Sequence, residues 1–373
     1  MSIQSHWVVP IPETSPQRWK IFINAENPDQ NFLTLSDFRL LSKRIALGLQ
    51  RAGPWPGDRI LPAFKGKLMA GGIFTGASPA SGKAELAYQL KDSGAAFAIA
   101  GNSSLSVAVE AAPQVGLPRN RIYAFHNSAT GTERTNGYDI RHWTDLLAPT
   151  AEAEKFHWVQ PVDPRSTTCC LHYSSKTTGI PKGVEITHYA YGLDPSWRDN
   201  IQRQRTICFM PMYHAAGQTA FIANHPKTGI PSYIMPACNF EKLLKCVHNF
   251  KITTLTTAPS IVLALAKSPL CSKFDLSSVE EVLCGTAPLA NEVSEQVAEP
   301  KAEGEQWFSG PTLIKGYWRN PKATLEATVE KDGEIIEWME SRAAKYKWLM
   351  GGFTFVDSIP RIPSGKILRR VLR

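Results

Sequence analysis

The chain has 373 residues, 43% of them hydrophobic and 20% charged, which are values of an ordinary globular protein and exclude a disordered or collagen-like chain. The formal net charge of +8 favours anionic ligands, but the basic residues are scattered and form no dense run of the kind that binds nucleic acid. No apolar stretch approaches the roughly 20 residues that a membrane-spanning helix needs. We therefore expect an anionic small-molecule ligand, no nucleic acid and no membrane span.

The seven cysteines include no C-x-x-C pair, and several lie in apolar runs, as Cys208 does in T-I-C-F-M. Reduced, buried cysteines of intracellular proteins show this pattern. The N-terminal stretch M-S-I-Q-S-H-W-V-V-P has neither the basic nor the apolar region of a secretion signal. The last three residues, V-L-R, differ from the peroxisomal signal S-K-L. These features predict a cytoplasmic protein.

Helices and strands alternate along the first part of the chain. Apolar residues at helical spacing predict a helix over residues 36–50 with Ser36 as its N-cap. A second helix is predicted over residues 81–93, ending at Gly94, where a glycine commonly closes a helix. Strands are predicted at residues 95–100 and 121–125. Residues 127–163 are polar and show no period, which predicts a long or partly ordered loop.

The alternation continues beyond this loop. Strands are predicted at residues 167–173, 184–187, 206–210, 232–235, 252–257 and 279–284. Helices are predicted at residues 240–248, with Asn239 as N-cap, and at residues 260–267. This order of elements predicts an α/β fold with mostly parallel sheets.

The chain turns sharply polar at K-D-G, residues 331–333, before a predicted helix at 334–347 and a predicted strand at 353–356. We place a domain boundary there. The prediction is a large N-terminal domain, residues 1–332, and a shortened C-terminal α+β domain, residues 333–373.

The loop Y-S-S-K-T-T-G-I-P-K-G, residues 173–183, follows one predicted strand and precedes another. Hydroxyls and free backbone N–H groups in such a loop can surround a polyphosphate, with a lysine opposite its charge. The residues that would do so are Ser174, Ser175, Thr177, Thr178 and Lys182. The loop lacks the P-loop pattern, and composition alone favours an ordinary solvent-exposed turn.

Three further stretches carry candidate residues. P-R-I-P-S-G-K-I-L-R-R presents Lys366 between a Pro/Gly turn and an arginine pair. P-M-Y-H-A-A-G places His214 after a predicted strand, and C-G-T-A-P-L places Ala287 after another, at the strand ends where open α/β sheets bind ligands. Taken singly, the first is as well explained by a basic tail and His214 by a packed residue.

Together and in this order, the four stretches closely resemble the motifs of the adenylate-forming superfamily. Within it they are most similar to the 4-coumarate–CoA ligase-like acyl-CoA ligases of fungi and plants. The resemblance extends through K-I-T-T-L-T-T-A-P-S and D-L-S-S-V-E-E-V-L-C-G-T-A-P-L to G-E-Q-W-F-S-G-P-T-L-I-K-G-Y-W-R-N-P-K-A-T. In the N-terminal part, M-A-G-G-I-F-T-G-A and E-L-A-Y-Q-L-K-D-S-G match as well.

The resemblance implies an ATP-dependent acid–thiol ligase that activates an aromatic or medium-chain carboxylic acid, in fungal secondary metabolism with possible pathway enzymes as partners. It implies ATP and coenzyme A as co-substrates and Mg²⁺ as the metal ion. Lys366 would stabilise the adenylation transition state, and His214 would border the reacting carboxylate. Ala287 would lie near the adenine. The phosphates would be held by Ser174, Ser175, Lys176, Thr177, Thr178 and Lys182.

The sequence also departs from the family pattern. Lys176 stands where the family has a glycine, and three segments are missing: a strand and helix after residue 61, the aromatic-Gly-x-Thr-Glu motif after residue 300, and the T-G-D motif with the hinge after residue 334. These motifs hold Mg²⁺ and the ribose in the family. Two alternatives therefore stay open: a catalytically impaired or ligand-binding paralogue, and a domain that loads a separate carrier protein.

Overall fold

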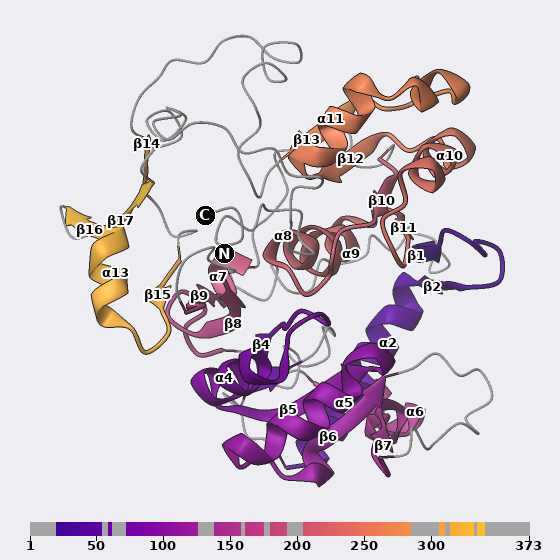
Figure 1. Ribbon diagram of the computed structural model, residues 1–373. Coiled ribbons are helices and arrows are strands. Elements are labelled where there is room, and N and C mark those ends of the chain that lie inside the picture. Colours follow the sequence, from indigo (N-terminus) through magenta and orange to yellow (C-terminus); the bar gives the residue numbers. More distant parts are fainter. Residues whose placement is uncertain are drawn as a thin grey trace.

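The computed structural model describes residues 20–53, 72–125, 138–157, 161–174, 180–191, 204–284 and 314–325 in full. It describes only the backbone of residues 59–61, 306–309, 326–331 and 334–339. These residues form three sheets with helices packed against them (Figure 1). The predicted α/β fold with mostly parallel sheets is confirmed.

The largest sheet has eight strands, in the order β15 (Gly316–Tyr317), β9 (Gly183–Thr187), β8 (Thr168–Tyr173), β4 (Ile73–Thr75), β3 (Arg59–Leu61), β5 (Ala95–Gly101), β6 (Ile122–Phe125) and β7 (Arg141–His142). Each neighbouring pair from β8 to β7 in this order is parallel. At the other edge, β9 is antiparallel to β8, and β15 is antiparallel to β9.

A second sheet has six strands, all parallel to their neighbours except the edge strand β2. Their order is β13 (Glu281–Cys284), β12 (Thr254–Thr257), β10 (Thr206–Cys208), β11 (Ser232–Ile234), β1 (Lys20–Asn24) and β2 (Phe32–Thr34). Since the strands on both sides of β10 run parallel to it, the carboxyl ends of β10, β12 and β13 meet at one edge of this sheet.

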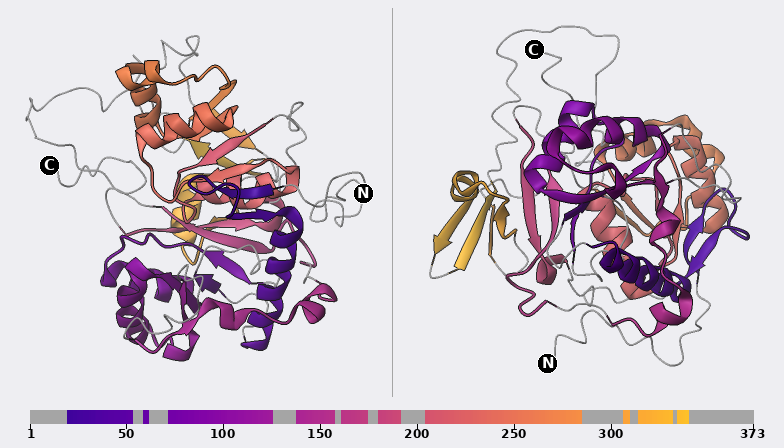
Figure 2. Two further views of the ribbon diagram at one scale, coloured as in Figure 1. Left: turned by 90° about the vertical axis from the view of Figure 1, so that its right-hand side faces the viewer. Right: turned by 90° about the horizontal axis from the view of Figure 1, so that it is seen from below.

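A third, three-stranded antiparallel sheet is set to the side of the body together with α13 (Pro321–Ala327), as both figures show (Figures 1 and 2). Its order is β14 (Gln306–Ser309), β17 (Glu334–Met339) and β16 (Thr328–Lys331). The helix predicted from residue 334 is wrong for residues 334–339, because E-I-I-E-W-M is rich in β-branched and aromatic residues and pairs on both sides. The proposed domain boundary falls between β16 and β17 and stays a prediction. The predicted strand at 353–356 lies outside the described residues.

The helices of the N-terminal part cover both faces of the large sheet. On one face, α4 (Lys83–Ser93) and α5 (Asn102–Ala111) bury Leu90 and Leu105 against the β5 and β6 side chains Ala98 and Ile122. On the other, α2 (Leu35–Arg51) buries Leu49 against residues that alternate with these along the same strands. Successive β5 side chains point to opposite faces of the sheet, and both faces are covered by helices. This is why nearly every residue of β5 is apolar.

The two predicted helix ends in this part had different outcomes. α2 begins two residues earlier than predicted, because Thr34 and not Ser36 is the N-cap. The Thr34 side chain accepts from the Asp37 N–H, and the Asp37 carboxylate accepts in return from the Thr34 N–H. α4 ends as predicted at Gly94, which has a left-handed φ of 65°.

Residues 138–157, part of the segment predicted as a long or partly ordered loop, form ordered elements that belong to the core. They form β7, a short 3₁₀ turn at Trp143–Leu146 and α6 (Thr150–Glu154). Leu146 is 3% exposed and packs on α2. A Cβ at Gly48 of α2 would lie 1.7 Å from the Leu146 carbonyl oxygen, so only glycine permits this approach. The segment has too few apolar residues at regular spacing to reveal its order from sequence.

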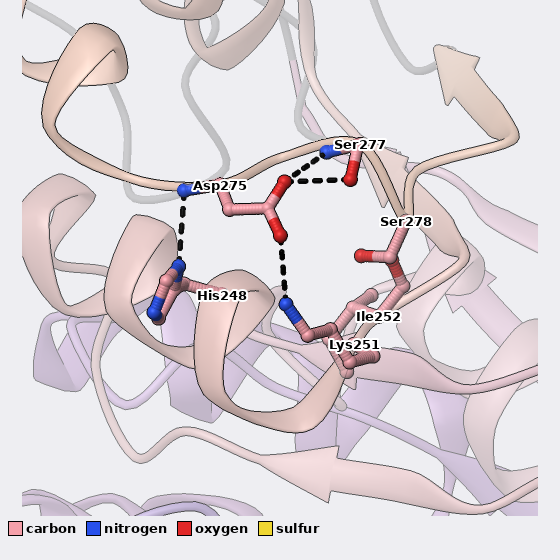
Figure 3. A network of polar contacts seen from close by, with 6 residues as sticks. All are labelled: His248, Lys251, Ile252, Asp275, Ser277 and Ser278. Atoms are coloured by element: carbon pink, nitrogen blue, oxygen red, sulfur yellow. Dashed lines mark hydrogen bonds and ion pairs between the residues drawn. The ribbon is translucent and has the colours of Figure 1, made fainter.

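The six-stranded sheet is covered by α10 (Phe240–Phe250) and α11 (Pro259–Lys267). As predicted, Asn239 caps α10, accepting from the Lys242 N–H at 2.9 Å. Behind α10 lies a surface network centred on Asp275 (Figure 3). Its carboxylate accepts from Lys251 at 2.8 Å and from the Ser277 hydroxyl at 2.6 Å, while its N–H donates to Nδ1 of His248 at 3.0 Å. These bonds attach the turn before β13 to the end of α10.

Four further helical segments lie close to the site described next. They are α7 (His188–Tyr191), α8 (Ala215–Gly217), a π-helical segment at Gln218–Asn224 and α9 (His225–Thr228). Among the described residues, no helix has both the length and the apolar character required to cross a membrane.

Candidate active site

The predicted phosphate loop connects β8 to its antiparallel neighbour β9. Its two ends meet at a hydrogen bond of 3.0 Å from the Ser174 N–H to the Lys182 carbonyl. The Ser174 hydroxyl is buried and has no hydrogen-bond partner in the structure. A buried, unsatisfied hydroxyl costs free energy, so a ligand oxygen at this point would stabilise it. Ser175, Lys176, Thr177 and Thr178 lie outside the described residues.

Helix α4 holds both ends of the loop. The Tyr173 hydroxyl donates to Oδ2 of Asp92 at 2.6 Å, and the Tyr88 hydroxyl donates to the Pro181 carbonyl at 3.0 Å. Burial, followed by the hydrogen bond to Asp92 and its charge, raises the pKa of Tyr173. Tyr173 therefore stays protonated and keeps donating at any physiological pH. The loop is thus attached at residues on both sides of its turn.

A second brace comes from Lys315, the residue that precedes β15 in the I-K-G-Y-W motif. Nζ of Lys315 lies 3.0 Å from Oε1 of Glu185, and the Glu185 side chain is 11% exposed. The hydroxyl of Thr168 in β8 also donates to this carboxylate. Because β8 and β9 flank the loop, this ion pair fixes the strands from which the loop emerges.

His214 follows β10 in the turn P-M-Y-H, as predicted. It is the N-cap of α8, where its Nδ1 accepts from the Ala216 N–H at 3.4 Å. The backbone N–H of His214 donates to the Pro211 carbonyl at 3.1 Å. A Cβ at Gly217 would come within 2.4 Å of the Pro211 carbonyl oxygen. The turn can therefore close only on a glycine, and it fixes the backbone of His214.

This turn contacts the large sheet at the end of β4. The Ser78 and Tyr213 hydroxyls are hydrogen-bonded at 3.2 Å, and a Cβ at Gly76 would lie 2.6 Å from the Tyr213 carbonyl oxygen. Gln89 of α4 holds the same strand end by donating to the Gly76 carbonyl at 2.9 Å. The carboxyl ends of β4 and β10, from two different sheets, therefore meet here.

The topology brings the predicted residues of two motifs to one region. β4 is the neighbour of β8, so the His214 turn at the end of β4 lies on the side of the sheet where Ser174 and Lys182 begin and end the loop. β13 ends at Cys284, opposite Thr257 of β12. Ala287 itself and Lys366 lie outside the described residues. The strand-end location predicted for His214 is confirmed, whereas the roles of these residues stay predictions.

Sequence reasoning missed several residues of this region. Asp92, Tyr213 and Ser78 gave no signal by themselves, since each acts through contacts between distant segments. Glu185 did offer one: in β9 it occupies the alternation of buried positions, where an ionised residue requires a partner. Among the residues that the structure describes, no group of three His, Cys, Asp or Glu side chains is arranged to hold a metal ion.

Comparison with known proteins decides the family. The family described as AMP-binding enzyme matches residues 12–300. The chain belongs to this family. This match and the relatives that follow confirm the predicted assignment to the adenylate-forming, 4-coumarate–CoA ligase-like enzymes, a class of acid–thiol ligases.

Among its relatives, the phenylacetyl-CoA ligase epaB of Aspergillus niger is 25% identical over 515 aligned positions, which cover 94% of this chain and 93% of the relative. The 4-coumarate–CoA ligase 1 of Petroselinum crispum is 31% identical, over 75% of this chain and 53% of its own length. The first alignment is longer than the 373 residues of this chain, so the relative has internal segments without a counterpart here. This confirms that the chain is shortened.

Solved structures share the fold. The anthranilate CoA ligase AuaEII in complex with anthranoyl-AMP has a TM-score of 0.72 at 15% identity, covering 95% of this chain and 94% of that one. The red-emitting luciferase of Phrixothrix hirtus has a TM-score of 0.71 at 22% identity, covering 85% and 89%.

Proposed function

We propose that the chain is an ATP-dependent acyl-CoA ligase for an aromatic or medium-chain carboxylic acid. In the first step a carboxylate oxygen attacks the α-phosphorus of ATP, and pyrophosphate leaves to give an acyl-adenylate. In the second, the thiolate of coenzyme A attacks the acyl carbon, and AMP leaves with the bonding electrons of the broken C–O bond. Adenylation is needed because a free carboxylate would have to expel oxide.

The observation that carries this proposal is the pairing of the buried, unpartnered Ser174 hydroxyl with Lys182 at the two ends of one braced loop. The backbone bond holds Ser174 and Lys182 at the same point of the loop, and an unsatisfied hydroxyl and a lysine side chain are both groups of the kind that bind an anionic oxygen. The loop lies at strand ends, where open α/β sheets bind ligands. Catalysis of this kind depends on positioning and on neutralising phosphate charge.

Roles for the residues follow from this site. The phosphates would be held by Ser174, Ser175, Lys176, Thr177, Thr178 and Lys182. His214, at the adjoining strand end, would border the carboxylate, and Ala287 would lie near the adenine. Lys366 would approach from the C-terminal residues 333–373 to neutralise charge in the adenylation transition state. Mg²⁺ would accompany the triphosphate, and hydroxyls such as that of Ser174 are oxygen ligands of the type this ion accepts.

The substrate class is supported by the printed names of relatives. Those of epaB, the parsley ligase and AuaEII refer to phenylacetate, 4-coumarate and anthranilate, which are all aryl acids. Four of the relatives are fungal acyl-CoA ligases or synthetases, which supports a role in fungal secondary metabolism beside other pathway enzymes. We place the protein in the cytoplasm.

A second candidate is a ligand-binding paralogue without ligase activity. It is favoured by the shortening of the chain, which removes the aromatic-Gly-x-Thr-Glu and T-G-D motifs. The loop and its braces would then bind nucleotide or acyl ligands without turnover.

Acid-dependent release of AMP separates the two candidates. The purified chain is incubated with ATP and Mg²⁺ across a panel of aryl and fatty acids, with and without coenzyme A. A ligase releases AMP only with an acid and coenzyme A, and Lys366→Ala abolishes the release while leaving ATP binding intact. Binding of ATP without AMP release by folded protein would favour the paralogue.

A further inference from the structure

Lys182, the lysine of the phosphate loop, lies against an aromatic ring from a distant part of the chain. Its Nζ is 5.2 Å from the ring centroid of Tyr317 in β15. Both side chains are half-buried. An ammonium within about 6 Å of a ring centroid is attracted by the negative face of the ring, and partial burial strengthens the attraction. The ring therefore restricts a side chain that otherwise has four rotatable bonds.

The position of Tyr317 is itself fixed on several sides. β15 pairs antiparallel with β9, with Tyr317 opposite Val184, so the ring is held two residues from the lysine it contacts. The Tyr317 N–H donates to Oγ1 of Thr324 at 2.9 Å. Gly316 has a φ of 152°, and a Cβ there would lie 2.9 Å from the Thr324 side chain, so this turn requires glycine.

The residues on either side of Tyr317 contact the same loop base. Lys315 forms the ion pair with Glu185 at 3.0 Å. The Trp318 N–H donates to the Gly183 carbonyl at 2.8 Å, and its indole Nε1 donates to the Asp92 carbonyl at 3.1 Å. We call Lys315, Tyr317 and Trp318, which lie in and beside β15, the β15 bracket. All three of its side chains attach to the loop base or to the helix that braces it.

We propose that Tyr317 is a positioning residue that holds the Lys182 ammonium ready for the phosphates of the bound nucleotide. A lysine side chain loses rotamer freedom when it binds an anion, and a side chain that is already restricted loses less. The ring acts through Lys182 and does not touch the nucleotide. This inference rests on the proposed function of the loop.

The contact can be tested without any catalysis. Limited acetylation of the full chain by an N-hydroxysuccinimide ester of acetic acid, followed by mass spectrometry, measures the reaction rate of each lysine. Tyr317→Leu removes the ring and is expected to raise the rate at Lys182 about two- to fivefold, the equilibrium effect of one half-exposed cation–π contact. Tyr317→Phe keeps the ring and is expected to match the wild type. Lys251, paired with Asp275 outside the bracket, serves as the internal reference.

The positioning role is tested by the KM for ATP in the AMP-release assay. Tyr317→Leu is expected to raise it about two- to fivefold, with kcat changed less, and Tyr317→Phe is expected to restore it. In a Lys182→Met background, Tyr317→Leu is expected to have no further effect, because its action passes through the lysine. A residue with a merely structural role would act equally in both backgrounds. If Tyr317→Leu does not fold, Tyr317→Gln replaces it.

The outcomes separate this inference from the proposed function. If inorganic pyrophosphate and ATP both fail to protect Lys182 of the wild-type protein from acetylation, the proposed function of the loop is wrong. If protection is seen but Tyr317→Leu and the wild type react equally at Lys182, the positioning role is overturned. An equal effect of Tyr317→Leu on KM with and without Lys182 would overturn it as well.

Discussion

Replacing Lys315 by methionine tests how the strands beside the phosphate loop are held. The substitution removes the ammonium 3.0 Å from Glu185 and keeps most of the apolar stem. The Glu185 side chain is 11% exposed, whereas that of Lys315 is 43% exposed. In the variant, the carboxylate would remain inside with the Thr168 hydroxyl as a donor.

The magnitude follows from this unequal burial. Removing one partner of a fully buried ion pair costs about 3–5 kcal/mol, whereas exposed pairs contribute about 0–1 kcal/mol. Because water reaches the lysine side of this pair, we expect Lys315→Met to lower the free energy of unfolding by about 2 kcal/mol. Glu185→Gln leaves the better-exposed lysine unpaired and keeps a hydrogen-bonding side chain, so we expect a loss of only about 0.5 kcal/mol.

The assay is urea unfolding followed by tryptophan fluorescence, with the two single variants and the double variant compared at neutral pH. The double variant Lys315→Met/Glu185→Gln should be more stable than Lys315→Met alone, because no charge is then left buried without its partner. Equal losses in the two single variants, or a double variant as unstable as the sum of both, would refute the reasoning.

Three further predictions concern stability. Asp275 has a lowered pKa, chiefly because Lys251 donates to it, so its stabilising contribution is present above the ordinary value of 3.8 and is lost as the pH falls; Asp275→Asn should lower the unfolding midpoint at pH 7 and approach the wild type in acid. Burial lowers the pKa of His188 to about 4 from 6.5, so the folded state loses stability as the pH falls below 6.5, and His188→Gln should flatten this dependence in thermal melts; an unchanged slope would contradict it. Tyr173→Phe should lower the free energy of unfolding in urea by about 1.5 kcal/mol, because it removes the hydrogen bond to the Asp92 carboxylate. Tyr88→Phe should lower it less, because it removes a hydrogen bond to a neutral carbonyl.

Much of the fold could be predicted because local patterns and tertiary structure agree. Asn239 precedes an amphipathic helix, Gly94 ends another, and apolar runs such as β5 are buried on both faces. Where they disagree, the prediction was incomplete for one segment and wrong for another. The order of residues 138–157 comes from packing of Leu146 against α2, and the strand at 334–339 comes from pairing with β14 and β16. The first is not visible in a local window, whereas the β-branched and aromatic residues of the second are a local signal that the helix prediction overlooked.

The candidate site was predictable to a similar extent. The position of His214 at a strand end follows from local pattern, and the family motifs identified the loop that contains Ser174 and Lys182. The contacts that brace this loop join residues separated by long stretches of chain, as in Tyr173 with Asp92 and Lys182 with Tyr317. Spacing along the sequence carries no information about such pairs, so only the folded arrangement reveals them.

The central claim is that this shortened chain still forms an acyl-adenylate. Exchange of labelled pyrophosphate into ATP measures that step directly, because it needs the acid, ATP and Mg²⁺ but not coenzyme A. We predict exchange that depends on an aryl acid and is strongly reduced in Lys182→Met, with the folded state of the variant checked by its melting curve. Absence of exchange with every acid of the panel, from folded wild-type protein whose Lys182 is protected by ATP, would contradict the claim and leave a nucleotide-binding paralogue.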